Sequence, residues 1–395
     1  MISENPNFSK LDHRYIFADV AERVAAEHAA HPERKILSLG IGDVTRPLSS
    51  PVSEAMAEAA REMGTPEGFR GYGDPCGSRA LREAIVTFYR ERRGILLSAD
   101  EIFVSDGAKR DLSDLSELFS KNNTVWMQNP GYPVYSEVTR LAGRRFVLGD
   151  ATGANGFLPM PGENDRLDLI YLCSPNNPTG AAYPKKALAA WVSYALENDA
   201  VILFDAAYAA FVRDPDVPRS IYEIPEAKRC AIEIASFSKF AGFTGVRCGF
   251  SVLPKALKVG GVSFSSLWKR RQEAKSNGIS HITERGAIAA LSGAALADEI
   301  TGIDSYLAGA RRLRTALSAL GFSVVGGENA PYLWVACPER LSSFSFFSLL
   351  LTECSVVVTP GVGFGSAGEG YVRLSSFAPH ADIEDAIARI TARFG

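Results

Sequence analysis

Short apolar runs alternate with helical segments between residues 101 and 253, and this alternation limits the fold more than any other feature of the chain. The apolar runs span residues 102–104, 125–127, 146–148, 169–173, 201–204, 231–234 and 249–253. Segments with apolar residues at helical spacing, such as 185–197, lie between several of them. Strands connected by helices form a largely parallel sheet with helices on both faces. We therefore predict an α/β fold around an open, mostly parallel seven-stranded sheet.

The segments on either side of this region predict a second, smaller domain. Amphipathic helices are expected over 19–28, 53–63 and 78–92, and a short strand over 35–39 that ends in the loop 40–43. After the sheet region come a long helical stretch, 282–320, and short apolar strands over 332–337, 356–359 and 371–375. We expect a large domain over residues 45–285 and a smaller α+β domain that combines residues 1–44 with 286–395.

The overall composition argues against several classes of function. The chain of 395 residues has a formal net charge of −3, so electrostatic binding to nucleic acid or to an anionic membrane is not expected. No apolar run reaches the length of a membrane span, and the N-terminal segment lacks the basic-then-apolar order of a signal peptide. The six cysteines form no CxxC motif, and the five histidines form no HxH or HxxxH pair. We therefore expect a soluble, cytoplasmic protein with reduced thiols and no metal.

Four loops directly follow predicted strands, which is where ligands bind in open parallel sheets. In the first, residues 105–109, Gly107 lets the backbone approach a ligand closely, and the amides that open the next helix form an anion site. An ordinary strand-to-helix turn is the alternative. In the second, residues 174–180, two prolines and a glycine fix a loop that can hold an asparagine side chain at a defined point. The alternative there is a turn without chemistry.

The third and fourth loops carry charged residues. Asp205 ends an apolar run, and a buried carboxylate there needs a cation such as a pyridinium N–H, unless it caps a helix or bonds another loop. In the fourth loop Ser236 and Ser238 precede Lys239 and Arg247. Hydroxyls and arginine suit a phosphate dianion, and a lysine among cationic and apolar neighbours loses its proton readily and can form an imine with an aldehyde. A surface loop is the alternative, although three nearby phenylalanines argue against full exposure.

These sequence strings together resemble a known family. The strings are Ser-Phe-Ser-Lys at 236–239 with Gly-Val-Arg-Cys-Gly at 245–249, Asn-Asn-Pro-Thr-Gly at 176–180 and Asp-Ala-Ala-Tyr at 205–208. They are similar to motifs of the class I/II aminotransferases, they occur in that family's order, and the resemblance covers nearly the whole chain. It implies the fold type I architecture of enzymes that use pyridoxal 5′-phosphate (PLP), and an aminotransferase activity.

The resemblance also implies roles for individual residues. Lys239 resembles the lysine that forms the Schiff base with PLP and shuttles protons, and Asp205 resembles the partner of the pyridine nitrogen. Arg373 resembles the arginine that grips the substrate α-carboxylate in a bidentate fork. The remaining candidates are Asn177 and Tyr208 at the ring 3-oxygen, Tyr132 stacked on the ring, Ser236, Ser238, Arg247, Ala108 and Lys109 at the phosphate, and Tyr72, which would reach the phosphate of the neighbouring subunit in a homodimer.

Further strings resemble one subgroup, the LL-diaminopimelate aminotransferases, which exchange an amino group between LL-2,6-diaminopimelate and 2-oxoglutarate in lysine and peptidoglycan synthesis. The strings are Arg-Tyr-Ile-Phe at 14–17, Leu-Gly-Ile-Gly-Asp at 39–43, Gly-Tyr-Gly at 71–73, Ser-Asp-Gly-Ala-Lys at 105–109, Phe-Asp-Ala-Ala-Tyr at 204–208, Ala-Pro-Tyr-Leu-Trp at 330–334 and Thr-Pro-Gly-Val-Gly-Phe-Gly at 359–365. This similarity implies a substrate pocket lined by Tyr15, Gly42 and Lys109, which Asn277 would enter from the other subunit.

One segment departs from the subgroup pattern. The subgroup follows Gly-Tyr-Gly with any residue and then an acid for the substrate's distal ammonium, whereas this chain has Asp74 followed by Pro75. Asp74 is the candidate for that role, and the next acid is Glu83. Lysine or another amino acid is therefore an alternative substrate, and a PLP enzyme with a different reaction is an alternative function. A non-catalytic effector domain is disfavoured because each expected cofactor contact has a candidate residue.

Overall fold

A seven-stranded sheet forms the centre of the larger lobe in the computed structural model, which describes residues 2–11, 16–162, 166–338 and 341–395. Within these ranges the strand order is β2-β8-β7-β6-β5-β3-β4. The strands are β2 (Ile102–Ser105), β3 (Val125–Asn129), β4 (Phe146–Asp150), β5 (Leu169–Cys173), β6 (Val201–Asp205), β7 (Ala231–Ser236) and β8 (Gly249–Val252). Neighbours are parallel except at β8, which runs antiparallel to β2 and β7. The predicted α/β fold with a mostly parallel seven-stranded sheet is therefore confirmed.

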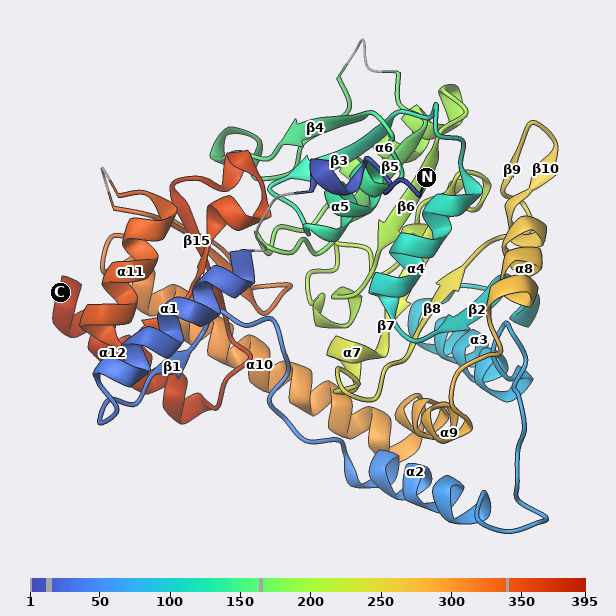
Figure 1. Ribbon diagram of the computed structural model, residues 1–395, viewed down its shortest axis with the longest axis horizontal. Helices are drawn as coiled ribbons and strands as arrows, with labels where there is room; N and C mark the ends of the chain where they lie inside the picture. Colours follow the sequence, from blue (N-terminus) through green and yellow to red (C-terminus); the bar gives the residue numbers. More distant parts are fainter. Residues whose placement is uncertain (1, 12–15, 163–165, 339–340) are drawn as a thin grey trace.

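Helices cover both faces of this sheet (Figure 1). On β5, Leu169 and Tyr171 share a core with helices α4, α5 and α8, while the alternating residues Ile170 and Leu172 share one with α3, α6 and α9. The elements around the sheet are α3 (Arg79–Arg93), α4 (Ala108–Leu115), α5 (Val134–Leu141), α6 (Lys185–Glu197), α8 (Phe264–Lys275), α9 (His281–Ala290) and the hairpin of β9 (Lys258–Val259) and β10 (Val262–Ser263). Because both faces of the strands other than β4 are largely buried, most of these strands read as apolar runs in the sequence. The edge strand β4 is more exposed.

Local signals explain where individual helices begin and end. Helix α3 starts after Ser78, whose side chain accepts a hydrogen bond from the Leu81 amide at 3.3 Å. It ends at Gly94, which has a φ of 68°, a left-handed conformation that glycine adopts without strain. Arginines in its last turn complement the negative end of the helix dipole.

A smaller lobe lies beside the sheet and joins segments that are far apart in the sequence. Its main sheet has the order β11-β12-β15-β14, and β1 pairs in parallel with β13, with Leu37 opposite Val356. In Figure 1 the blue helix α1 lies against the red C-terminal helices of this lobe. The elements are α1 (Ile16–Ala30), β1 (Leu37–Ser38), β11 (Val324–Gly326), β12 (Tyr332–Ala336), α11 (Ser343–Cys354), β13 (Val356–Val357), β14 (Thr359–Pro360), β15 (Tyr371–Ser375) and α12 (His380–Phe394). The predicted domain boundaries near residues 45 and 285 stay predictions.

The helical stretch predicted over 282–320 is interrupted. Helix α9 and the long helix α10 (Gly293–Ala319) meet at a bend of 76°, and α2 (Ser50–Glu62) packs against α9. Gly293 begins α10 with a φ of +56°, which most residues with a side chain avoid. Within the described ranges, no single helix is long and apolar enough to cross a membrane. The bent pair meets that criterion, by length and composition, only when both helices are counted together.

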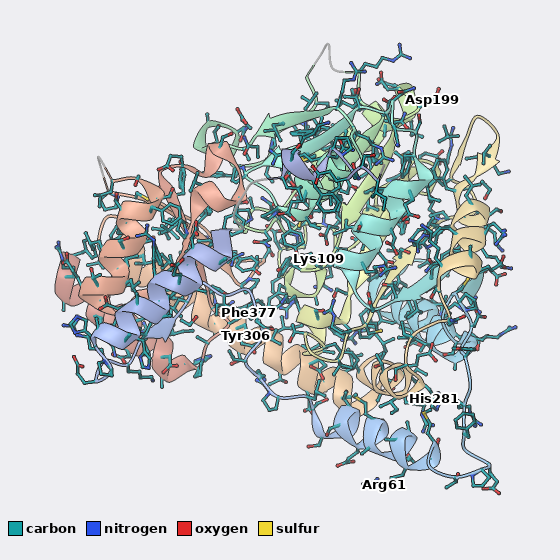
Figure 2. The ribbon with its side chains drawn as sticks, in the orientation of Figure 1. Arg61, Lys109, Asp199, His281, Tyr306 and Phe377 are labelled. Atoms are coloured by element: carbon teal, nitrogen blue, oxygen red, sulfur yellow. The ribbon has the colours of Figure 1, made fainter. Side chains whose placement is uncertain are left out.

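An aromatic cluster connects α10 to the smaller lobe. Figure 2 shows Tyr306 of α10 next to Phe377, and their ring centroids are 4.9 Å apart. The Tyr306 hydroxyl also accepts hydrogen bonds from the backbone amides of Thr45 (3.0 Å) and Arg46 (2.8 Å). The segment that follows β1 is therefore held in place between the two lobes.

Candidate active site

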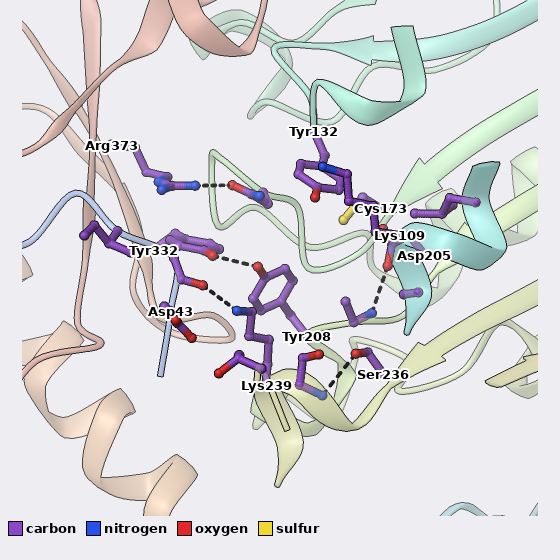
Figure 3. A pocket seen from close by; sticks show the side chains of 18 of the residues that line it. Asp43, Lys109, Tyr132, Cys173, Asp205, Tyr208, Ser236, Lys239, Tyr332 and Arg373 are labelled. Atoms are coloured by element: carbon purple, nitrogen blue, oxygen red, sulfur yellow. Dashed lines mark hydrogen bonds between the residues drawn. The ribbon is translucent and has the colours of Figure 1, made fainter. Parts of the chain in front are cut away.

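A cavity of about 400 Å³ lies where the loops after the parallel strands meet the smaller lobe. This is the position that ligands occupy in open α/β sheets. Most of the predicted site residues line it: Gly42, Ala108, Lys109, Tyr132, Asn177, Asp205, Tyr208, Ser236, Ser238, Lys239, Arg247 and Arg373. Figure 3 shows their side chains converging from both lobes. The structure thus brings together residues that are separated by more than half of the chain.

Lys239 lies at the bottom of the cavity on the short helix α7 (Phe237–Phe240), directly after β7. Its Nζ donates a hydrogen bond to the carbonyl oxygen of Gly42. Burial lowers the pKa of Lys239 to about 8; the nearby Asp43 opposes this shift, and the positive charges of Arg373 and Arg247 add to it. An amine with this pKa is neutral in a large fraction of molecules near pH 8, so it can attack a carbonyl carbon.

Asp205 ends β6 with a side chain that is only 4% exposed. Its Oδ2 accepts a hydrogen bond from the Tyr135 hydroxyl at 2.7 Å, and its Oδ1 accepts one from the Ala207 amide at 3.0 Å. Burial raises the pKa of Asp205, and among the described residues no cation pairs with it. A buried carboxylate on a cavity wall is stabilised by a cationic ligand atom, and a protonated ring nitrogen has this character.

An anion site surrounds the start of α4. The Ser238 hydroxyl accepts a hydrogen bond from Arg247 Nη1 at 3.3 Å, and the Ser236 hydroxyl accepts one from the Ser238 amide at 3.0 Å. The first residues of α4, Ala108 and Lys109, lie on the same wall, with helix amides that have no partner inside the helix. Two hydroxyls, a guanidinium and a helix N-terminus form a donor set that suits a phosphate group.

Two glycines allow this close packing. A Cβ on Gly249 of β8 would lie 2.8 Å from the Gly107 Cα and 2.9 Å from the Ala108 nitrogen. A Cβ on Gly107 would lie 2.4 Å from Arg247 Nη2, and Gly107 itself has a φ of +135°. The helix start and the guanidinium can therefore approach each other only because both positions lack a side chain.

Arg373 on β15 is a buried guanidinium that faces the cavity from the smaller lobe. Its Nη1 donates to Asn177 Oδ1 at 2.7 Å, and its Nη2 donates to the Gly40 carbonyl at 2.6 Å. Its Nε is buried without a hydrogen-bond partner, and no carboxylate among the described residues forms an ion pair with it. The rings of Tyr332 and Phe364 lie 4.5 and 4.7 Å from its central carbon. A buried, uncompensated guanidinium of this kind is suited to a carboxylate ligand.

The structure adds lining residues that we did not predict from the sequence: Ile41, Asp43, Leu112, Cys173, Ala207, Thr244 and Tyr332. Tyr332 exchanges a hydrogen bond of 2.6 Å with the hydroxyl of Tyr208, and burial raises the pKa of both phenols. Asp43 and Tyr332 both belong to strings that support the family resemblance, at 39–43 and 330–334. The two strings indicated these segments of the chain, but they did not specify which of their residues face the cavity.

Other predicted residues lie away from this cavity within the same chain. Tyr72 is 91% exposed, and Asp74 forms an ion pair with Arg82 (Oδ2 to Nη2, 3.2 Å) and accepts a hydrogen bond from the Cys76 amide at 2.8 Å. The loop of Asn277 contacts the same segment, because its carbonyl accepts the Gly73 amide at 3.1 Å. The residues expected to act across a subunit interface are thus adjacent to each other. The predicted pocket residue Tyr15 is outside the described residues.

Comparison with known proteins identifies the family. The model of the family "Aminotransferase class I and II" matches residues 34–390. The chain belongs to the class I and II aminotransferases. These enzymes depend on PLP, and the residues of the cavity fit that cofactor: an anion site for its phosphate, a buried carboxylate for its ring nitrogen and an amine of lowered pKa for its aldehyde carbon.

Two full-length relatives carry the same name. This aminotransferase is 46% identical to the LL-diaminopimelate aminotransferase of Phocaeicola vulgatus, over 98% of each chain. The structure of L,L-diaminopimelate aminotransferase from Chlamydomonas reinhardtii matches with a TM-score of 0.94 and 41% identity, and it covers 100% of this chain and 99% of that chain. An aspartate aminotransferase double mutant from Thermus thermophilus has a TM-score of 0.87 at 24% identity over 99% and 100% of the two chains, which shows the shared fold.

Proposed function

We propose that this aminotransferase transfers an amino group from LL-2,6-diaminopimelate to 2-oxoglutarate in lysine and peptidoglycan synthesis. The observation that carries the proposal is the similarity, over nearly the entire chain, to relatives named LL-diaminopimelate aminotransferase. The cavity supports it, because the buried guanidinium of Arg373 suits the α-carboxylate that both substrates possess.

In this proposal each wall of the cavity holds one part of the cofactor. Ser236, Ser238, Arg247 and the amides of Ala108 and Lys109 hold the phosphate, and Tyr132 stacks on the ring. Asp205 holds a proton on the ring nitrogen, and Asn177 and Tyr208 hydrogen-bond to the ring oxygen. When bound, PLP draws electrons from the substrate Cα through its protonated ring, so that the Cα proton becomes acidic.

Lys239 then has two tasks at one atom. Its Nζ would hold the cofactor by its aldehyde carbon between turnovers, and it would serve as the base that accepts the proton from the substrate Cα. The lowered pKa of Lys239 favours the neutral form that accepts this proton. Arg373 orients the substrate by its carboxylate, so that the Cα hydrogen points toward the amine.

We further propose that the active unit is a homodimer whose sites are completed across the interface. Support comes from the position of Tyr72 and Asn277, which lie on adjacent loops outside the cavity of their own chain. An aromatic side chain that is 91% exposed is suited to burial against a partner. Asp74 belongs to the same loop pair. The six thiols form no disulfides, which is consistent with a cytoplasmic enzyme.

A second candidate is an aminotransferase for lysine or another amino acid. The engagement of Asp74 with Arg82 favours an amino acid without a distal ammonium, since this acid is the predicted partner of that group. Purified enzyme with PLP and 2-oxoglutarate should be assayed for glutamate formation from a panel of amino donors. The proposal expects the highest kcat/KM with LL-diaminopimelate. A higher value with lysine would replace it by the second candidate, and no glutamate from any donor would contradict both.

A further inference from the structure

We propose that Asp43 of the same chain binds the distal ammonium of the substrate and so determines specificity for diamino acids. This inference rests on the proposed function, because it concerns the second amino group of a diaminopimelate or lysine substrate. The sequence pattern predicted this role for Asp74. The inference assigns it instead to Asp43, in the loop 40–43 that follows β1.

The acids of the cavity wall leave one carboxylate available. Among the described residues that line the cavity, the acids are Asp43 and Asp205. Asp205 is buried at the base, and both of its oxygens accept hydrogen bonds from Tyr135 and Ala207. Asp43 forms no hydrogen bond or ion pair within the described part of the chain. It is therefore the carboxylate of this cavity that is free to receive a cationic ligand group.

Asp74 is less suited to this role. One of its oxygens accepts the Cys76 amide, and the other is paired with Arg82, whose side chain is only 14% exposed. A substrate ammonium would have to compete with a guanidinium that is already in place. The carboxylate lies outside the cavity of its own chain, so in the proposed homodimer it would face the substrate of the partner, whereas Asp43 lines the cavity of its own Lys239.

Asp43 lines the same cavity as Lys239 and Arg373. Figure 3 shows Asp43 beside Lys239 and below Tyr332, with Arg373 on the far side of the Tyr332 ring. A substrate whose α-carboxylate meets Arg373 and whose Cα lies next to Lys239 can extend its side chain along the wall that carries Asp43. The negative charge of Asp43 acts to raise the pKa of both Lys239 and Tyr332.

The backbone around Asp43 is fixed on both sides, which a specificity residue requires. Before Asp43, the Ser375 amide donates a hydrogen bond to the Leu39 carbonyl at 2.6 Å, and Arg373 Nη2 donates one to the Gly40 carbonyl. After it, the amides of Thr45 and Arg46 donate to the Tyr306 hydroxyl. The side chain itself is exposed, so a bound substrate replaces water around it rather than displacing a protein partner.

A paired set of substrates isolates the contact. LL-Diaminopimelate and L-2-aminopimelate have the same carbon chain and differ by the distal ammonium. Lysine and norleucine also have the same carbon chain, which ends in an ammonium-bearing carbon in lysine and in a methyl group in norleucine. The kcat/KM ratio within each pair should be measured for the PLP-loaded wild type, for Asp43→Asn and for Asp298→Asn. Asp298 is an exposed acid that lines a second cavity, which also contacts Lys239. The Asp298→Asn variant therefore removes one negative charge nearby without changing the proposed contact.

The expected result is a loss of at least about tenfold in both ratios for Asp43→Asn and little change for Asp298→Asn, because a hydrogen bond between charged groups contributes this much. An effect of Asp43 on the pKa of Lys239 changes the numerator and the denominator alike, so it cancels in the ratio. Ratios that stay within about twofold of the wild type in Asp43→Asn would overturn the inference. If the wild type prefers lysine to diaminopimelate, the proposed substrate fails, but the ratio within the lysine pair still decides the role of Asp43.

Discussion

The amine of Lys239 has a pKa of about 8 because it is buried, and this value predicts a pH dependence. A lysine with an unshifted pKa would become more reactive up to about pH 10.5. Here the neutral fraction rises about tenfold per pH unit below 8 and then saturates. The rate at which apo-enzyme attaches PLP covalently, followed by absorbance after rapid mixing, should therefore level off above about pH 8. A rate that keeps rising to about pH 10 contradicts this reading of the site.

The contacts of Arg373 predict how its substitution affects different substrates. Arg373→Lys replaces a planar fork by a point charge, which cannot hold a carboxylate at two atoms. It also removes a donor from Asn177 Oδ1 or from the Gly40 carbonyl. We expect kcat/KM to fall by about tenfold or more for all α-amino acids alike. The assignment of Arg373 to the α-carboxylate is wrong if only diamino substrates are affected.

Individual site residues were predictable from the sequence where short motifs follow strands. Asp205 ends β6 and Lys239 lies on α7, directly after β7, so the fold itself places them at the same edge of the sheet. Asp43 was not identified, because it lies in a loop and is defined by its distance to residues from other parts of the chain. For Asp74, the sequence could not show that Arg82, one helical turn into α3, would occupy its carboxylate.

At the scale of elements, the contact between β8 and the start of α4 predicts the effect of one methyl group. Gly249→Ala would place a Cβ 2.8 Å from the Gly107 Cα, so the helix start must move away from the anion site. We expect the dissociation constant for PLP to rise by about tenfold or more, measured by titration of apo-enzyme. Gly153→Ala is the matched control, since a Cβ there meets no atom within 4 Å. Unchanged PLP affinity in Gly249→Ala would show that the amides of α4 do not hold the phosphate.

The strands were predicted better than the long helices. Burial on both faces explains the apolar runs of the strands other than β4, and β4 begins with an apolar run although it is largely exposed. Such runs therefore identify all strands of the central sheet in the described residues. The break between α9 and α10 escaped prediction, because apolar residues at helical spacing continue through it. The backbone turns at Gly293, whose φ is +56°, and α9 packs against α2.

At the scale of the whole molecule, shared sites predict that two inactive variants restore each other. Lys239→Ala and Tyr72→Ala should each be inactive as homodimers, because each removes a residue from every site. Co-expressed heterodimers contain one site with Lys239 from one chain and Tyr72 from the other. With random pairing, about half of the dimers are heterodimers with one intact site of two, so we expect about a quarter of the wild-type activity in the unfractionated mixture.

The control for this experiment is a pair of variants on the same side of the interface. Lys239→Ala co-expressed with Arg373→Ala leaves no intact site in any pairing, since both residues line the cavity of one chain. Activity that returns only with the Tyr72 variant supports shared sites. No recovery in either mixture refutes sites shared through Tyr72, and a monomer at assay concentration in sedimentation refutes the homodimer.

The pairing of β1 with β13 has a consequence for the order in which the protein matures on the ribosome. Leu37 is synthesised long before its partner Val356. Until Val356 is synthesised, the apolar side chains of Leu37 and Leu39 lack the contacts that bury them in the folded protein. The central sheet and Lys239 are by then already available for folding. Arg373 follows β13 and arrives later still. A nascent chain can therefore assemble its cofactor-binding loops before it acquires the arginine that recognises a substrate.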